Sequence, residues 1–308
     1  MKRILRNIAL ALVTGYVFFF FGERVFWSLP GPGDTLISNL LGWLLYSFAA
    51  YATLIVVDYF KVKTRWSAFL AAAFFGWLIE GVVAMTFFGA EGLPFPITVS
   101  WTGLAWHGLI GVFLGWYLML GVLSKNQYKK ITLASITLGI FWGVWSLAWA
   151  LETPPISVTP DIYLLHGLLT TLLLCASYYL FFRLKPAEFR SSRWERIIIA
   201  LPVVAFFGFV TIPFIGLLSL VLPVFFGGLY LALRKNKKDE SESSFLASFS
   251  ESPKMRIYPL LLIAPIIAAL IYNAGPTLRT NLVILIITTA LGFILLSISL
   301  YKVFRRLS

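Results

Sequence analysis

The sequence predicts an all-α integral membrane protein, a polytopic bundle of about ten transmembrane helices. Three observations carry this prediction: the composition, the spacing of the apolar windows and the distribution of positive charge. Fifty-nine per cent of the 308 residues are hydrophobic and only 12 per cent are charged. A soluble chain of this length cannot cover so much apolar surface with polar groups, so the lipid bilayer is its expected solvent and partner.

The apolar windows define the expected helices in order. One span needs about 20 apolar residues at a rise of ~1.5 Å each. The windows are 7–27, 36–60, 66–88, 99–123, 131–151, 160–182, 197–212, 214–233, 257–275 and 281–303. The first lacks a small-x-small cleavage site before Ser28, so we expect a retained helix. The seventh and eighth windows are interrupted by Pro202, Pro213 and Pro223. This pattern predicts a spanning pair that turns at 211–213, with a re-entrant element as the alternative.

Positive charge predicts the orientation of these helices. With a cytoplasmic N-terminus, only Arg24 and Arg279 of the 25 lysines and arginines fall on the outer side. We therefore expect a multi-pass protein of the cell membrane with both termini cytoplasmic. The net charge of +12 then reflects membrane orientation, and no nucleic acid is expected as a partner.

Two polar segments predict the domain organisation. The basic loop 183–196 separates a six-helix membrane region, 1–182, from a four-helix membrane region, 197–308. Within the second region, residues 234–256 are charged and rich in serine. Such a composition favours a flexible cytoplasmic linker.

A short motif occurs twice in the first region. Residues 96–109 read P-I-T-V-S, six residues, then H-G-L, and residues 155–168 read P-I-S-V-T, six residues, then H-G-L. His107 and His166 in these motifs are the only histidines of the chain. Each motif follows an apolar window in the same orientation, so we expect helices three and four to be repeated as five and six, a parallel duplicated hairpin.

Carboxylates accompany both copies of the motif. Glu80 precedes the first copy and Glu152 the second. Glu80 shares a helical face with small residues such as Gly76, and His107 shares one with Gly103. Stripes of small residues let helices approach closely, so these side chains are expected to point into the bundle.

Three of these groups lie at a similar depth. Glu80, His107 and His166 are each about six to eight residues from the outer end of their helix, or about 9–12 Å below the outer surface. An ionisable side chain inside a membrane costs about 2.5–3.5 kcal/mol on insertion scales, which makes each a functional candidate. Glu152, at the mouth of its helix, is a fourth candidate for binding a ligand or a proton. The alternative is that it is an outer helix cap or a solvated loop residue.

The residue types suit several kinds of chemistry. Glu80, His107 and His166 are expected either to bind a divalent metal such as zinc or to relay protons during solute passage. Axial ligation of a haem by the two histidines is a less favoured alternative. The simplest alternative is that each histidine only forms packing hydrogen bonds between helices.

One stretch resembles a family of intramembrane enzymes. Residues 140–146, I-F-W-G-V-W-S, are followed by L-H-G-L-L at 165–169. These stretches resemble the second and third motifs of the CAAX-protease and bacteriocin-processing family, which implies a metal-dependent enzyme acting on lipid or peptide. Ser146 stands where that family has a histidine, and Thr170 where it commonly has an asparagine, so the resemblance assigns no catalytic residue.

The leading hypothesis is a transporter or channel-like protein for a small solute or ion, with an outward-facing pocket formed by Glu80, His107 and His166. The alternatives are the intramembrane enzyme and a non-catalytic subunit of a membrane assembly. The sequence contains no H-E-x-x-H, G-x-S-x-G, C-x-x-C or Walker A motif, which argues against the hydrolytic and ATP-driven classes that these motifs define.

Overall fold

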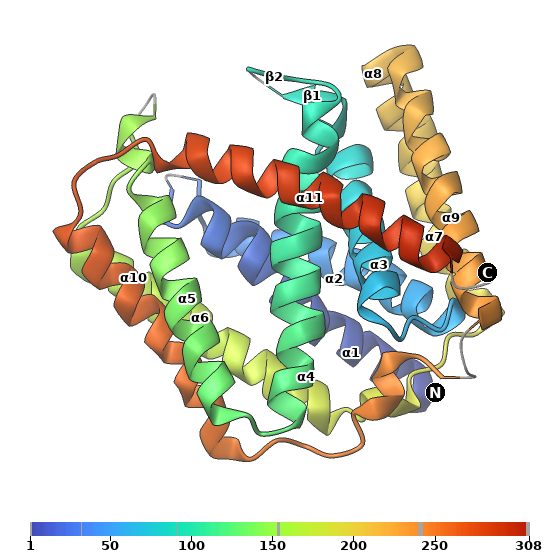
Figure 1. The fold of residues 1–308 in the computed structure, drawn as a ribbon, viewed down its shortest axis with the longest axis horizontal. Helices are drawn as coiled ribbons and strands as arrows, with labels where there is room; N and C mark the ends of the chain where they lie inside the picture. The colour runs from blue at the N-terminus through green and yellow to red at the C-terminus, as the bar shows by residue number, and fades with distance from the viewer. Residues whose placement is uncertain (1, 32, 91, 153–154, 240–242, 306–308) are drawn as a thin grey trace.

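The computed structural model describes residues 2–31, 33–90, 92–152, 155–239 and 243–305, and within them the chain is almost entirely helical (Figure 1). The longer helical elements are α1 (Lys2–Phe19), η1 (Phe20–Val25), α2 (Leu36–Tyr59), α3 (Arg65–Leu78), η2 (Ile79–Val83), η4 (Val99–Leu118), α4 (Met119–Ser124), α5 (Tyr128–Ser146), α6 (Pro160–Arg183), α7 (Arg193–Phe206), η7 (Phe207–Thr211), α8 (Ile212–Ile215), η8 (Gly216–Leu220), α9 (Val221–Asp239), η10 (Met255–Leu262), α10 (Ile263–Ala274) and α11 (Thr280–Arg305). Short 3₁₀ turns are η3 (Thr86–Phe88), η5 (Trp149–Leu151), η6 (Pro186–Glu188) and η9 (Phe245–Ser248), and the described strands are the two-residue β1 (Gly89–Ala90) and β2 (Leu93–Pro94).

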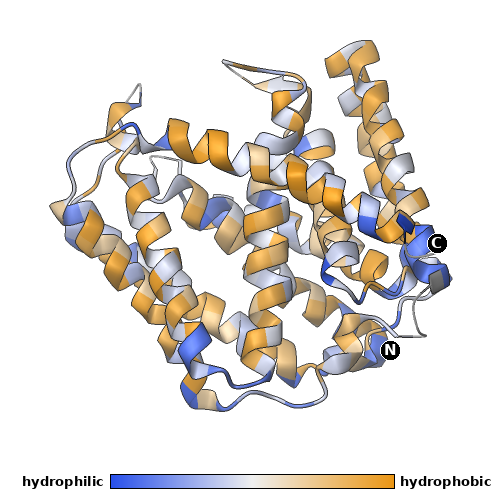
Figure 2. Ribbon diagram, viewed as in Figure 1, coloured by the Kyte–Doolittle hydropathy of each residue, from blue (hydrophilic) through white to orange (hydrophobic). Residues whose placement is uncertain are grey.

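Nine helical stretches of the described chain are long and apolar enough to cross a membrane. The predicted all-α membrane class is therefore confirmed. Hydrophobic residues make up most of the helices (Figure 2), and many of the large ones are exposed. Phe209 and Leu217 are 84 and 86 per cent exposed, as expected for side chains that contact acyl chains.

Local sequence signals fix several helix starts. The side chains of Thr35, Thr64 and Ser192 each accept a hydrogen bond from the backbone N–H three residues later and complete capping boxes for α2, α3 and α7. Pro160 stands in the first turn of α6, where its missing N–H costs nothing. These signals place the starts close to those expected from the apolar windows.

The seventh and eighth expected helices differ from the prediction in the position of the turn between them. Residues expected as two helices form one helical stretch of 46 residues, Arg193–Lys238. The chain remains helical past Pro202 and past Pro213, which lies in the first turn of α8, and turns back at Gly216 with a φ of 73°. The predicted turn at 211–213 is therefore wrong, and α7 and α9 form the two arms of a hairpin (Figure 1).

The last helices pack into the same bundle as the first six. Helix α10 packs against α5 and α6, and α11 packs against η4 and α3. Small residues allow these contacts: a Cβ atom on Gly139 would lie 2.6 Å from the carbonyl oxygen of Ala264, and one on Gly292 would lie 2.3 Å from Oγ of Ser100. The regions 1–182 and 197–308 thus share one core.

The predicted duplicated hairpin is not evident in this packing. Helix α3 packs directly against η4, whereas α5 and α6 each pack against α10. The two sequence copies therefore have different neighbours.

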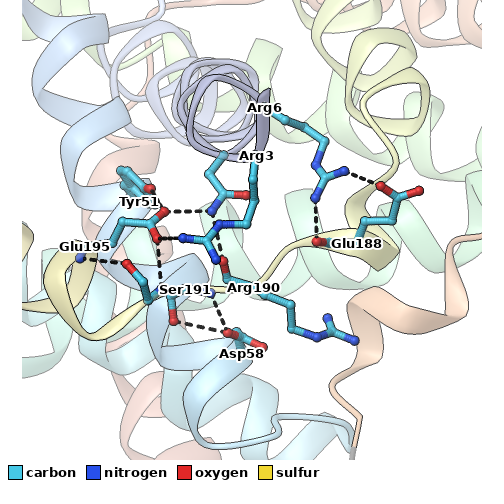
Figure 3. A network of polar contacts seen from close by, with 10 residues as sticks. Arg3, Arg6, Tyr51, Asp58, Glu188, Arg190, Ser191 and Glu195 are labelled. Atoms are coloured by element: carbon cyan, nitrogen blue, oxygen red, sulfur yellow. Dashed lines mark hydrogen bonds and ion pairs between the residues drawn. The ribbon is translucent and has the colours of Figure 1, made fainter. Parts of the chain in front are cut away.

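A polar network joins α1, α2 and the loop before α7 near the N-terminus (Figure 3). Buried Glu195 accepts hydrogen bonds from Asn7 at 2.8 Å, from the Tyr51 hydroxyl at 2.6 Å and from Arg3 at 3.0 Å. Asp58 accepts one from the backbone N–H of Ser191 at 2.9 Å. The basic loop expected as a joint is firmly held by α1 and α2.

The segment expected as a flexible linker is largely structured in its described part. Helix α9 continues to Asp239, and the turn η9 packs on the bundle. The backbone N–H of Phe245 donates to the carbonyl of Val62 at 2.7 Å, and the Phe245 ring lies 5.2 Å from that of Trp116. Phe245 and Phe249 are both buried, so their apolar area outweighs the polar composition around them.

Candidate functional site

A buried carboxylate and a buried imidazole meet in the centre of the bundle. Nε2 of His107 lies 2.6 Å from Oε1 of Glu80, and the two side chains are 7 and 6 per cent exposed. The two atoms are within hydrogen-bonding distance of each other. The Thr86 hydroxyl donates to the other oxygen of Glu80, while Nδ1 of His107 has no hydrogen-bond partner among the described residues.

Close packing of two helices brings this pair together. A Cβ atom on Gly76 would lie 1.9 Å from the carbonyl oxygen of Gly103, so the backbones of α3 and η4 are in direct contact. Glu80 and His107 each lie four residues beyond these glycines, on the same helical faces. The small-residue stripes in the sequence predicted this approach, and the structure places the two side chains together.

Two further polar side chains extend the pair toward one end of the bundle. The Tyr46 ring lies 5.8 Å from the His107 ring, and the Tyr46 hydroxyl donates to Oε1 of Glu23 at 2.7 Å. Nε1 of Trp27 donates to the other oxygen of Glu23 at 2.9 Å. Gly22 leaves room for this arrangement, because a Cβ there would lie 2.6 Å from the Tyr46 hydroxyl and 2.9 Å from Cε1 of His107.

We call the connected side chains from the Glu80–His107 pair through Tyr46 and Glu23 to Trp27 the polar chain. Three of its ionisable residues lie in π-helical turns. Glu23 belongs to η1, Glu80 to η2 and His107 to η4, and all three segments are wound as π-helix. Such turns are rare, and they occur most often at functional sites. A further π-helical segment of the described chain, η7, contains no ionisable residue.

A cavity opens at the Trp27 end of the polar chain. It has a volume of about 450 Å³, and its described lining includes five aromatic residues: Phe26, Trp27, Trp101, Trp145 and Trp149. Glu152 also lines the cavity, and its Oε1 accepts a hydrogen bond from Asn281 at 3.1 Å. We call this cavity the aromatic pocket. Trp27 belongs both to the pocket and to the polar chain, so the two are connected through one side chain.

The structure does not bring His166 to the pair. His166 is half-buried on α6, and its ring makes no hydrogen bond within the described residues. No group of three or more His, Cys, Asp or Glu among them is arranged to hold a metal. The expected ligand set of Glu80, His107 and His166 is therefore not assembled. Helix α6 packs on α1 and α10 and meets η4 only further along, where the Tyr178 hydroxyl donates to the carbonyl of Gly115. Zinc sites usually need three or four protein ligands.

The resemblance to the protease family places hydroxyl residues, Ser146 and Thr170, at two motif positions. Each of these hydroxyls forms a hydrogen bond within its own helix. Ser146 donates to the carbonyl of Gly143 at 2.6 Å, and Thr170 donates to the carbonyl of His166 at 2.8 Å. Both are common helix-internal contacts and do not build a site around His166.

The sequence reasoning missed Tyr46 as a site residue and did not single out Glu23. A tyrosine in an apolar window is more often an interfacial aromatic, so Tyr46 carried no distinguishing signal. Glu23, an acid near the end of the first apolar window, was the available signal. The part of the outer loops at Glu91, Thr153 and Pro154 lies outside the described residues.

Comparison with protein-family models, with curated proteins and with solved structures finds no match to this chain. The fold and composition define a helical multi-pass membrane protein, and the side-chain geometry is what bears on its function.

Proposed function

We propose that this chain is a proton-coupled transporter of a small solute, in which the aromatic pocket receives the solute and the Glu80–His107 pair carries the proton. The observation that supports this proposal is the polar chain from the pocket through Trp27, Glu23 and Tyr46 to the pair. In the proposed orientation, the pocket faces outward and both termini are cytoplasmic, as the distribution of lysine and arginine favours.

The electrostatics of the pair suit a proton carrier. With one shared proton, Glu80 and His107 are neutral together, and adding or removing a proton leaves one net charge in a low-dielectric interior. The protonation state of such a pair responds strongly to a nearby charge. Glu23, joined to the pair through Tyr46, is the charge that connects proton occupancy to events in the pocket.

The transporter is favoured over the two other hypotheses on specific grounds. A metal-dependent enzyme needs a ligand set that the described residues do not assemble. A purely structural subunit has no need for three ionisable residues in π-helical turns, since their burial and winding cost stability.

The test uses the full chain reconstituted in liposomes on a solid-supported membrane, with the proton itself as the probe. A step in external pH is expected to produce a charge displacement that is absent from protein-free liposomes. Glu80→Gln removes the titrating carboxylate with little change of shape, and we expect it to reduce this displacement at least about tenfold. Glu251→Gln, the same substitution at an exposed residue, is the control and should behave as the wild type.

Two results would overturn the proposal. One is a wild-type response no larger than that of empty liposomes. The other is an unchanged response in Glu80→Gln protein that elutes as a single folded species, which would leave the pair with a packing role only.

A further inference from the structure

The aromatic pocket has the composition of a site for an organic cation. Its described lining combines five aromatic rings with one ionisable side chain, Glu152. The faces of indole and phenyl rings carry negative potential and attract cations, most strongly when water is excluded. From this combination we infer that the pocket binds a small substituted ammonium ion, the class that includes quaternary ammonium groups. This names the solute of the transporter proposed above, although binding itself does not depend on transport.

The rings surround the pocket at several angles. The Trp145 and Trp149 rings lie 5.9 Å apart and are perpendicular, and the Trp101 and Trp145 rings are 6.1 Å apart at 54°. The Trp27 and Trp149 rings are 5.3 Å apart at 35°. Walls in different orientations let a rounded alkylammonium group contact more than one ring. The volume of about 450 Å³ is within the usual range for small-molecule sites.

Few hydrogen-bond donors in the pocket are free to bind an anion. The indole N–H of Trp145 donates to the carbonyl of Phe26, and that of Trp27 donates to Glu23. Nε1 of Trp149 has no partner among the described residues. A negatively charged ligand would therefore meet ring faces, a carboxylate and few donors, whereas a cation would meet complementary groups.

Glu152 is held in place but its charge is not neutralised by any described cation. Its contact is the amide of Asn281, and the Asn281 carbonyl oxygen in turn accepts the backbone N–H of Leu282 at 2.9 Å, which fixes the amide at the start of α11. Arg24 is already paired with Asp34 at 2.7 Å, and Arg279, two residues before Asn281 in the sequence, is exposed and forms no ion pair within the described residues. No lysine or arginine of the described chain forms an ion pair with Glu152, so the carboxylate can complement a bound cation.

The chemistry of the walls selects among cations. Sodium, potassium and divalent ions hold their water strongly, and aromatic rings offer too little in exchange. An alkylated ammonium has weakly bound water and an apolar surface that packs against indole, so it gains both the hydrophobic and the electrostatic contribution.

The test measures binding by isothermal titration calorimetry to the full chain in lipid nanodiscs. The probe is choline, and the matched ligand is 3,3-dimethyl-1-butanol, which has the same shape without the charge. We expect saturable choline binding and at least about tenfold weaker binding of the neutral isostere, since ring faces attract a desolvated cation and offer the isostere only apolar contact.

Variants locate the binding in the pocket. Glu152→Gln and Trp149→Leu are each expected to weaken choline binding at least about fivefold, whereas Trp149→Phe, which keeps a ring, should retain most of it. Asp161→Asn makes the same acid-to-amide change as Glu152→Gln at an exposed residue outside the pocket and should leave the affinity unchanged.

Several outcomes would overturn the inference. Equal affinity for choline and its isostere would show that the pocket is only an apolar cavity. Unchanged binding in both pocket variants would place the ligand elsewhere. The absence of saturable binding would show that the pocket is not a site for this cation. These failures are distinct from failure of the proposed function. Choline binding without any proton-driven charge displacement would support this inference and reject the transporter. Charge displacement without choline binding would support the transporter and reject this inference.

Discussion

The two copies of the H-G-L motif end in different environments. His107, in the first copy, is buried and bonded to Glu80 at 2.6 Å. His166, in the second, is half-buried and has no hydrogen-bond partner for its ring among the described residues. The segments differ in winding as well, because η4 is π-helical while α6 is a regular α-helix.

The packing partners explain this difference. Small residues of the first copy are used for contact between its own two helices, at Gly76 and Gly103. Those of the second are used against α10, where a Cβ on Gly167 would lie 2.8 Å from Cβ of Pro265. The repeated sequence thus forms a helix with a stripe of small residues in both copies. Which neighbouring helix packs on that stripe then determines whether the histidine lies beside a carboxylate.

Removal of each histidine should give the largest contrast. His107→Ala leaves Glu80 buried without its partner, and breaking a buried pair costs about 3–5 kcal/mol, less whatever the carboxylate recovers by taking up a proton. His166→Ala should cost about 1 kcal/mol or less because no polar partner is lost. Thermal unfolding of the purified proteins in detergent measures both, and equal losses would contradict the distinction between the copies.

The glycine contacts should give an intermediate effect. Gly76→Ala forces a methyl group against the backbone of η4 and should cost about 1–3 kcal/mol despite the better helix propensity of alanine. Gly167→Ala places its methyl group closest to a side-chain atom, Cβ of Pro265 at 2.8 Å, and should cost less. The control is Gly121→Ala in α4, where no atom lies within 4 Å, and unfolding temperature should stay level or rise. A smaller loss for Gly76→Ala than for Gly167→Ala would show that α3 and η4 are not in direct contact.

The smallest expected change tests the polar chain beside the first copy. Tyr46→Phe removes one hydrogen bond to Glu23, which should cost about 1–2 kcal/mol and should also weaken the pH-driven charge displacement. Tyr258→Phe is the matched control, since that hydroxyl is buried without a partner among the described residues. An unchanged charge displacement in Tyr46→Phe would remove this tyrosine from the proposed proton path.

Much of the fold follows from local sequence features. Apolar windows were sufficient for most helix positions, and the structure shows capping residues such as Thr35 and Ser192 at the helix starts. The turn at Gly216 was missed because Pro213 was interpreted as the break, although a proline in the first turn of a helix does not interrupt it. The buried position of Phe245 was missed because composition averages over a segment and hides individual anchors.

Only part of the candidate site, the Glu80–His107 pair, could be predicted from the sequence. Glu80 and His107 could be paired because both lie on small-residue faces of neighbouring helices. His166 has the same motif, but its partner α10 lies about a hundred residues further along the chain, and no local pattern identifies such a neighbour. The same holds for Tyr46 and Glu23, whose bond depends on how α1 and α2 cross.

The shared core of the early and late helices limits how this protein can move. Helix α10 packs against α5 and α6, α11 packs against η4, and Phe245 lies beside Trp116, so the early and late helices of the described chain contact one another instead of forming two separate halves. Under the proposed function, access to the buried acid and imidazole would then depend on small local rearrangements, such as rotamer changes and shifts of register in the π-helical turns.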